Sequence, residues 1–202
     1  MSINYPSSQA LVALDAEAVR TSVDLVAKTT DQDLDRLTPC RGWTLYGLLA
    51  HMTAQHHGFA SSARGEADPV LWRTRSLGDD PVATYRAAAD EVLAAFAADD
   101  LADRKVVLPE FSLTMTLPAL QVVGFHLVDY VVHAWDVART LDLPVDFEPA
   151  VLEAALGVAR AVPNDASRLA PGAPFAPAVE SSGGSTLDEI VALLGRSPAW
   201  PR

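Results

Sequence analysis

Apolar residues recur along most of the chain at the three- to four-residue spacing that favours amphipathic helices. The first such stripe includes Leu11, Leu14 and Val19, and similar stripes follow after connections that contain Pro or Gly. Segments of this length with one apolar face are typical of helices that pack against one another. The pattern predicts helices over residues 8–29, 44–62, 80–98, 118–141, 148–161 and 186–195.

Local signals mark several of the helix ends. Thr44 is a residue type that caps helix N-termini, and Asp80 followed by Pro81 combines an N-cap with proline at the first helical position. The longest predicted helix stops before Pro144, because a residue that precedes proline is disfavoured in the helical conformation. The last helix ends at Gly195, a residue type that is common just after helices.

A short segment between the third and fourth helices has a different composition. Val106, Val107, Thr114 and Thr116 favour β-structure, and residues 109–112 provide a turn between them. The sequence therefore predicts a short β-hairpin near residues 105–117.

Four main helices joined by short connections predict an all-α fold, a four-helix bundle. The length of 202 residues suits one domain with an ample hydrophobic core. We therefore expect a single domain over residues 1–202, with the bundle in 8–141 and a small helical C-terminal tail in 142–202.

The chain is acidic, with 15 Lys and Arg residues against 26 Asp and Glu residues and a formal net charge of −11. This charge disfavours nucleic acid and anionic membranes, so we expect neither as a partner. No apolar run reaches the ~18 residues of a membrane-spanning helix, and residues 1–6 do not resemble the start of a signal peptide. The single cysteine, Cys40, excludes an internal disulfide framework. The sequence thus predicts a cytoplasmic protein.

The helix predicted over residues 118–141 carries a polar stripe. At about 100° per residue, a single arc of about 80° contains His126, Asp129, His133 and Asp136. Apolar residues flank the stripe on both sides, which indicates a buried helix rather than a solvated face. Buried carboxylates and imidazoles are unfavourable unless they are paired or bind a metal. The stripe is therefore the first candidate for a site.

Asp129 and His133 are four residues apart, so both side chains point the same way from adjacent turns and can chelate one ion. His51, at the edge of the apolar face of the helix predicted over 44–62, is the matching third residue. Two imidazoles and one carboxylate suit Zn²⁺ with open coordination positions, and equally Fe²⁺, Ni²⁺ or Mn²⁺. The sequence therefore predicts a site for one divalent metal. A buried polar network without metal is the alternative.

Other polar and aromatic residues near these helices are harder to assign. His56 and His57 come five and six residues after His51, so their side chains leave the helix in other directions than that of His51. We predict surface or pocket-rim positions for them. Cys40 precedes a helix start, where the helix dipole lowers the pKa of a thiol, but the sequence assigns it no His or Asp partner. No catalytic residue is therefore assigned. The pocket candidates are Arg41, Trp43, Gln55 and Trp135, with core packing as the common alternative for the two tryptophans.

Three segments together resemble one protein family. Residues 38–44, followed by Leu48-Leu49-Ala50-His51, resemble the T-P-C-x-x-W-T…L-x-x-H segment of the DinB-like superfamily, in its mycothiol-dependent maleylpyruvate isomerase branch. Residues 126–138 resemble the metal helix of that branch, and residues 187–198 resemble the ending of its short actinobacterial members. The resemblance spans essentially the whole chain.

This resemblance implies a DinB-like four-helix bundle with one divalent metal, usually zinc. Carried over position by position, it implies the ligands His51, Asp129 and His133. Many relatives have Glu at the position of Asp129, and Asp is one methylene shorter. His126 is therefore the substitute ligand if Asp129 does not reach the metal.

Asp136 lies one turn beyond His133 and has two interpretations. It can orient an imidazole by accepting its N–H, as carboxylates commonly do behind metal-bound histidines. Alternatively, it forms a salt bridge to an arginine such as Arg41 or Arg139.

A metal held by three residues has open coordination positions, which a thiolate can occupy. A bound divalent cation keeps such a thiol deprotonated. The resemblance implies a metal-dependent thiol transferase or isomerase that activates mycothiol, as co-substrate, for attack on an electrophilic small molecule. The isomerase that it resembles is expected to carry a separate C-terminal domain, whereas only residues 142–202 follow the metal helix here. Isomerase activity on maleylpyruvate is therefore not implied.

Two other functions fit the same residues. One is a non-catalytic metal-binding bundle, for example in a stress response, and the other is a metallohydrolase whose open position holds hydroxide. A thiol enzyme predicts that reduced mycothiol perturbs the spectrum of the metal, and a hydrolase predicts a metal-dependent pH optimum with no thiol requirement. The sequence leaves a homodimer open, since apolar helix faces can support one.

Overall fold

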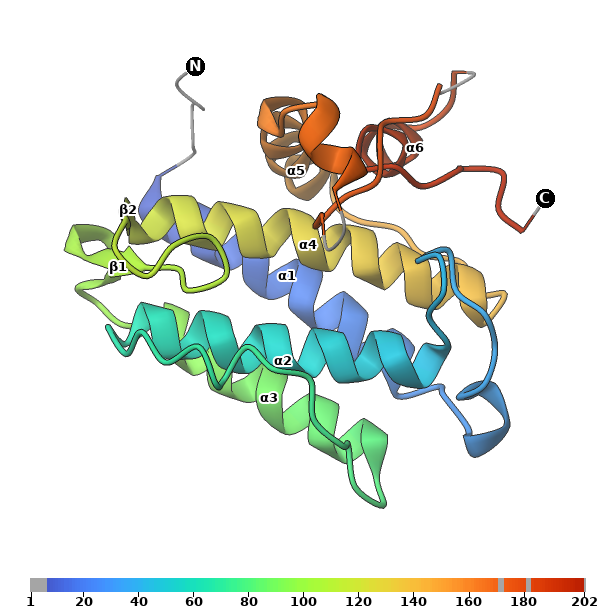
Figure 1. The fold of residues 1–202 in the computed structure, drawn as a ribbon, viewed down its shortest axis with the longest axis horizontal. Helices are drawn as coiled ribbons and strands as arrows, with labels where there is room; N and C mark the ends of the chain where they lie inside the picture. Colours follow the sequence, from blue (N-terminus) through green and yellow to red (C-terminus); the bar gives the residue numbers. More distant parts are fainter. Residues whose placement is uncertain (1–6, 171–172, 181–182, 202) are drawn as a thin grey trace.

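The computed structural model describes residues 7–170, 173–180 and 183–201, and four long helices form its body. These helices are α1 (Ser8–Val26), α2 (Leu45–Ala63), α3 (Pro81–Phe96) and α4 (Ala119–Thr140). α1 packs along α4, α2 packs along α3, and α2 also contacts α4, so that the four form a bundle (Figure 1). The all-α bundle predicted from the sequence is confirmed.

Buried hydroxyl groups tie the bundle helices together. The hydroxyls of Ser22 on α1 and Tyr85 on α3 lie 2.6 Å apart. The Tyr130 hydroxyl on α4 donates to the backbone carbonyl of Met52 on α2 at 2.5 Å. Tyr85 and Tyr130 are both fully buried, and a buried hydroxyl is unfavourable without such a partner. These contacts therefore fix the helices relative to one another.

α2 and α4 run antiparallel, which decides which turns of the two helices meet. His51, early in α2, lies against His133, late in α4, with ring centroids 5.3 Å apart. His56, one to two turns further along α2, lies against His126, which is earlier in α4. The polar stripe of α4 therefore faces α2.

The predicted capping residues make the expected contacts. The Thr44 side chain accepts a hydrogen bond from the Gly47 N–H at 3.3 Å, and the Asp80 side chain accepts one from the Ala83 N–H at 2.9 Å. All six α-helices begin and end within three residues of their predicted bounds. The largest difference is at the end of α1, where the chain turns into a 3-10 helix, Asp31–Asp33.

The predicted hairpin is present as two short antiparallel strands, β1 (Lys105–Val107) and β2 (Thr116–Pro118), with Val106 opposite Leu117. The connection covers residues 108–115 and is longer than the turn expected at 109–112. It passes in front of the bundle between α4 and α2 in the view of Figure 1.

The C-terminal tail packs on the far side of α4. α5 (Pro149–Ala161) contacts α1, α4 and α6 (Thr186–Leu193), and Figure 1 shows α5 and α6 on the side of α4 away from α2 and α3. Between them, the guanidinium of Arg168 donates to the carbonyls of Pro163 and Leu193 at 2.7 and 2.6 Å. In the part of the chain that the structure describes, no helix combines the length and apolar character needed to cross a membrane.

Candidate metal centre

Three side chains from two facing helices converge between α2 and α4. One ligand atom each of His51, Asp129 and His133 lies within 4.8 Å of the other two. Nε2 of His133 is 3.3 Å from Oδ1 of Asp129, and the rings of His51 and His133 meet edge to face. The fold thus brings together the three residues that the sequence singled out as ligands.

This cluster is buried at its base and open at its rim. The side chain of His133 is 4% exposed and that of Asp129 is 18% exposed, and His51 is half-buried. Burial restricts the rotamers of His133, while Asp129 and His51 remain in partial contact with solvent.

Two of the three side chains are in the ionisation states that bind divalent cations, and the third, His133, carries a proton in the metal-free protein. Burial lowers the pKa of His51 to about 4, with a further contribution from the charge of His133, so its imidazole is neutral. Burial alone would raise the pKa of Asp129, but the charge and hydrogen bond of His133 lower it to about 2. Burial alone would lower the pKa of His133, yet the Asp129 and Asp136 carboxylates raise it well above its usual value.

Asp136 is hydrogen-bonded to Nδ1 of His133, the ring nitrogen that does not face Asp129. Its Oδ2 lies 2.9 Å from Nδ1 of His133, and the Asp136 side chain is fully buried. The same oxygen accepts hydrogen bonds from the Arg196 guanidinium at 3.2 Å and from the Cys40 thiol at 3.1 Å. The charge of Arg196 and these hydrogen bonds lower the pKa of Asp136 although burial opposes them.

The arginine paired with Asp136 is neither of the two expected from the sequence. Arg196 follows α6 and is 8% exposed, whereas Arg139 donates to the Trp200 carbonyl at 2.5 Å and Arg41 is exposed. The expected pairing is therefore corrected: the tail folds back on α4 and supplies the cation from 60 positions away in the chain.

A second group of ligand atoms lies on the other side of the His133 ring. Cys40, His133 and Asp136 also place one atom each within 4.8 Å of the others. The Arg196 guanidinium, however, lies 3.2 Å from the Asp136 carboxylate and 3.4 Å from the Cys40 sulfur. A positive charge at this position repels a second cation. The set of His51, Asp129 and His133 is therefore the better candidate.

Of the four pocket candidates, two lie beside the cluster. Trp43 is 38% exposed, and its ring lies 4.7 Å from that of His51. Gln55 follows His51 by one helical turn and is buried. Trp135 is 4% exposed and lies on the opposite side of α4 from His133, because two residues advance a helix by about 200°. It therefore belongs to the core rather than the site.

The surface or rim position predicted for His56 is wrong, because its side chain is fully buried. Nδ1 of His56 lies 3.2 Å from Nε2 of His126, and Nδ1 of His126 lies 2.7 Å from Oδ1 of Asp15. Both ring nitrogens of His126 are thus engaged, so we do not retain it as the substitute ligand. His57 is half-exposed and pairs with Glu91 at 2.6 Å.

Two residues near the cluster, Arg196 and Glu110, were not predicted as site residues from the sequence. Arg196 is separated from α4 by the whole tail, and spacing rules reach only a few residues. Glu110, in the hairpin connection, accepts a hydrogen bond from Gln55 at 3.3 Å. Its position in a turn next to the polar helix is the one feature that pointed toward it.

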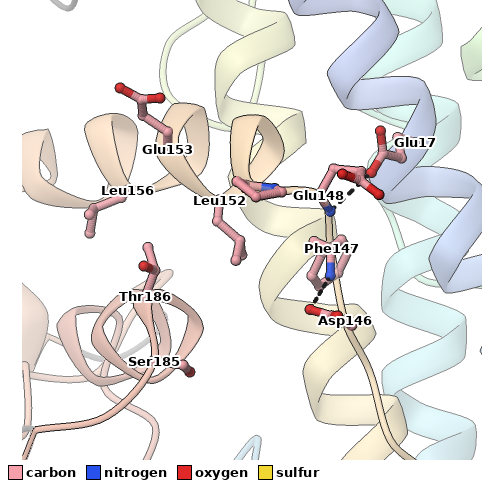
Figure 2. A pocket seen from close by; sticks show the side chains of 10 residues that line it. Glu17, Asp146, Phe147, Glu148, Leu152, Glu153, Leu156, Ser185 and Thr186 are labelled. Atoms are coloured by element: carbon pink, nitrogen blue, oxygen red, sulfur yellow. Dashed lines mark hydrogen bonds between the residues drawn. The ribbon is translucent and has the colours of Figure 1, made fainter.

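A separate cavity of about 780 Å³ lies between α1, α5 and the start of α6. Figure 2 shows carboxylates of Glu17, Asp146 and Glu153 around it, with the Leu152 side chain among them. Two of these carboxylates accept backbone N–H groups at the start of α5, where anionic groups are favoured. Among the described residues, the acids of this cavity do not form a group of converging metal ligands.

The fold and the cluster define a helical-bundle protein with a candidate three-residue metal centre between facing helices. Comparison with solved structures agrees with the helical-bundle fold. The chain belongs to the family of the mycothiol maleylpyruvate isomerase N-terminal domain, whose model matches residues 16–138. This range contains α2, α3, most of α1 and α4, and all three candidate ligands.

Relatives and solved structures extend the similarity beyond that range. An uncharacterized protein of Mycobacterium tuberculosis, Rv0738 in strain H37Rv, is 30% identical over 176 residues, which cover 86% of this chain and 90% of that protein. The same values hold for MT0763 of strain CDC 1551 / Oshkosh. The crystal structure of the mycothiol-dependent maleylpyruvate isomerase matches with a TM-score of 0.64 and 15% identity, over 95% of this chain and 90% of that chain.

A histidine-to-alanine mutant of that isomerase also matches, with a TM-score of 0.64 and 12% identity, over 92% of this chain and 88% of that chain. At these identities the structures establish the fold alone. The sequence led us to expect that the isomerase carries a separate C-terminal domain with no counterpart in residues 142–202. This expectation is wrong for these solved chains, because 90% and 88% of them are matched.

Proposed function

We propose that this protein is a metal-dependent thiol transferase or isomerase, which uses mycothiol as its thiol and an electrophilic small molecule as its substrate. The observation that carries the proposal is the convergence of His51, Asp129 and His133 within 4.8 Å. Membership of the mycothiol maleylpyruvate isomerase N-terminal domain family supports the choice of thiol.

The donor set fits a divalent cation such as Zn²⁺. His51 is neutral and Asp129 is ionised, which are the forms that bind metals. His133 holds a proton between two carboxylates in the metal-free protein, and metal binding at Nε2 would release it. When bound, the cation would keep a thiol deprotonated near neutral pH and leave its sulfur nucleophilic.

The chain's own residues would orient the reaction. Asp136 accepts the Nδ1–H of His133 and so directs Nε2 toward Asp129 and His51. Trp43, beside His51 and partly exposed, would form an apolar wall for the substrate. We treat residues 8–141 and 142–202 as one functional unit, because Arg196 of the tail reaches Asp136.

Metal content tests the first part of the proposal. We expect close to one equivalent of a divalent metal in the purified native protein by inductively coupled plasma mass spectrometry, and little in His133→Ala. Cys40→Ala is the matched control, since the Cys40 sulfur belongs to the other group of ligand atoms, Cys40, His133 and Asp136, and not to the proposed metal site. It is expected to keep the metal. Absence of metal from the native protein, with the fold intact, would refute the proposal.

A thiol titration separates this function from its two alternatives. In the Co²⁺-substituted protein, reduced mycothiol is expected to produce a sulfur-to-cobalt charge-transfer band. A metallohydrolase would show metal-dependent hydrolysis with no such band, and a non-catalytic metal-binding bundle would show neither. The absence of the band at saturating mycothiol would rule out thiol activation.

A further inference from the structure

The hairpin connection of residues 108–115 is fixed to α2 close to the candidate metal centre. Nε2 of Gln55 donates to Oε1 of Glu110 at 3.3 Å, and Gln55 is 5% exposed. Gln55 follows His51 by four residues, so the two side chains leave the same face of α2 about 6 Å apart along its axis. The Glu110 carboxyl group is therefore held one helical turn from the His51 ligand position.

The same connection is also fixed to α4. The ring of Phe111 packs edge-on against that of Phe125, with centroids 5.8 Å apart. Phe125 precedes Asp129 by four residues and lies on the same side of α4. The connection thus joins α2 to α4 next to the cluster, and adjacent residues of it contact the two helices.

The Glu110 carboxyl group lies in a different environment from the rest of the residue. Glu110 as a whole is exposed, but burial of its carboxyl and, as the second cause, the charge of Asp129 raise its pKa to about 7. The hydrogen bond from Gln55 acts in the opposite direction. Asp129 on α4 is the charged group that acts on it, and α2 contributes the uncharged amide of Gln55. A carboxyl group of this kind exchanges protons readily near neutral pH.

We propose that Glu110 is a catalytic residue, which accepts and returns the proton in the thiol reaction proposed above. This inference rests on that proposed function. The hydrogen bond of Glu110 to Gln55, one helical turn from His51, and its place within the field of Asp129 support it.

The proposed step is the addition of a thiol to an electrophilic double bond. The Glu110 carboxylate takes the proton of the thiol S–H, and the sulfur keeps the electron pair. That pair forms the new bond from sulfur to the electrophilic carbon, and the π pair of the double bond moves to the neighbouring atom. Protonated Glu110 then delivers its proton to that atom and becomes a carboxylate again. Elimination of the thiol is the reverse of this sequence.

Rapid mixing of mycothiol with the Co²⁺-substituted protein tests this role without measuring turnover. The rate at which the sulfur-to-cobalt band forms is followed against pH. With Glu110 as proton acceptor, the rate is expected to rise and then level off above the pKa of Glu110, which the nearby cation holds below the value of about 7 in the metal-free protein. In Glu110→Gln we expect a rate at about pH 7 that is ~100-fold lower and that keeps rising toward the thiol's own pKa of about 8.5.

Two further variants sharpen the test. Gln55→Met removes the hydrogen bond that lowers the Glu110 pKa, so the break in the native profile is expected to move to higher pH. Glu153→Gln changes an exposed carboxylate in the distant cavity and is expected to leave the rate and the break unchanged.

The outcomes are distinguishable. A Glu110→Gln protein that keeps the native rate and break overturns the role of Glu110 while the thiol function stands. Loss of cobalt from Glu110→Gln also overturns it, because Glu110 would then be a metal ligand. If the native protein forms no band at all, the proposed function fails, and the inference fails with it.

Discussion

Oδ2 of Asp136 lies 2.9 Å from Nδ1 of His133, while Nε2 of the same imidazole faces Asp129 at 3.3 Å. A fully buried carboxylate thus determines which nitrogen of His133 is directed toward the candidate metal. Arg196 and Cys40 both donate to that carboxylate. The orientation of one candidate ligand therefore depends on a residue from the C-terminal tail.

Removal of the charge on Asp136 is expected to weaken metal binding without removing a ligand. In Asp136→Asn the hydrogen bond to His133 is weaker, and the dissociation constant for Zn²⁺ is expected to rise about 10–100-fold. Competition with a chromophoric chelator measures this change. Asp146→Asn, which keeps the side-chain acceptor for the Phe147 N–H, is the matched control. Equal affinity in Asp136→Asn and the native protein would contradict the orienting role.

Removal of Arg196 is expected to destabilise the fold strongly. Its guanidinium and the imidazole of His133 together compensate the buried charge of Asp136. Because His133 remains in Arg196→Met, the expected loss lies at the lower end of the ~3–5 kcal/mol that breaking a buried ion pair costs. Urea unfolding of Arg196→Met measures the loss. In the double variant Arg196→Met/Asp136→Asn no charge remains unpaired, so we expect part of the stability to return. Strict additivity of the two single changes would argue against this pairing.

The buried His56 predicts a dependence of stability on pH. Burial, together with the charges of His126 and His57, lowers its pKa well below 6.5 in the folded protein. Below that value the unfolded chain binds a proton that the folded chain does not. Stability therefore falls as pH decreases below about 6.5, by up to about 1.4 kcal/mol per pH unit from this group.

Urea unfolding of the metal-free protein at about pH 7, 6 and 5 measures this slope. In His56→Asn, whose amide can still contact His126, the slope is expected to be shallower by the contribution of His56. His57→Asn alters a half-exposed histidine and serves as the control. An unchanged slope in His56→Asn would show that other groups account for the pH dependence.

Gly58 allows a close approach between α2 and Trp72 of the following loop. A Cβ atom at this position would lie 2.3 Å from the Trp72 ring, and the same ring packs on Phe59 with centroids 5.0 Å apart. Gly58→Ala is therefore expected to reduce stability by about 1–3 kcal/mol, as measured by urea unfolding.

Gly157 of α5 is the matched control for this change, because nothing lies within 4 Å of a Cβ there. Gly157→Ala is expected to increase stability by about 0.5–1 kcal/mol through helix propensity alone. If Gly58→Ala is also stabilising, the loop that carries Trp72 moves without penalty.

Local sequence signals account for the helices and for the contacts within one helix. The apolar periodicity located all six helices, and Thr44 and Asp80 cap the helices that follow them. The closeness of His133 to Asp129 and Asp136 follows from spacings of four and three residues, because backbone geometry alone sets that distance in a helix. The place of His51 at the edge of an apolar helix face suggested it as the third member of the cluster, and the family resemblance implied the same residue. Spacing along one helix could not show that it faces Asp129 and His133.

The tertiary structure decided which distant side chains complete the cluster. His56 is buried because the antiparallel packing of α2 on α4 places it against His126. Arg196 and Glu110 reach the cluster through the tail and the hairpin connection. The sequence by itself determined the elements and the neighbours within a turn, since these depend on local backbone geometry. Contacts between distant segments depend on how whole apolar faces pack, and residue spacing does not encode that.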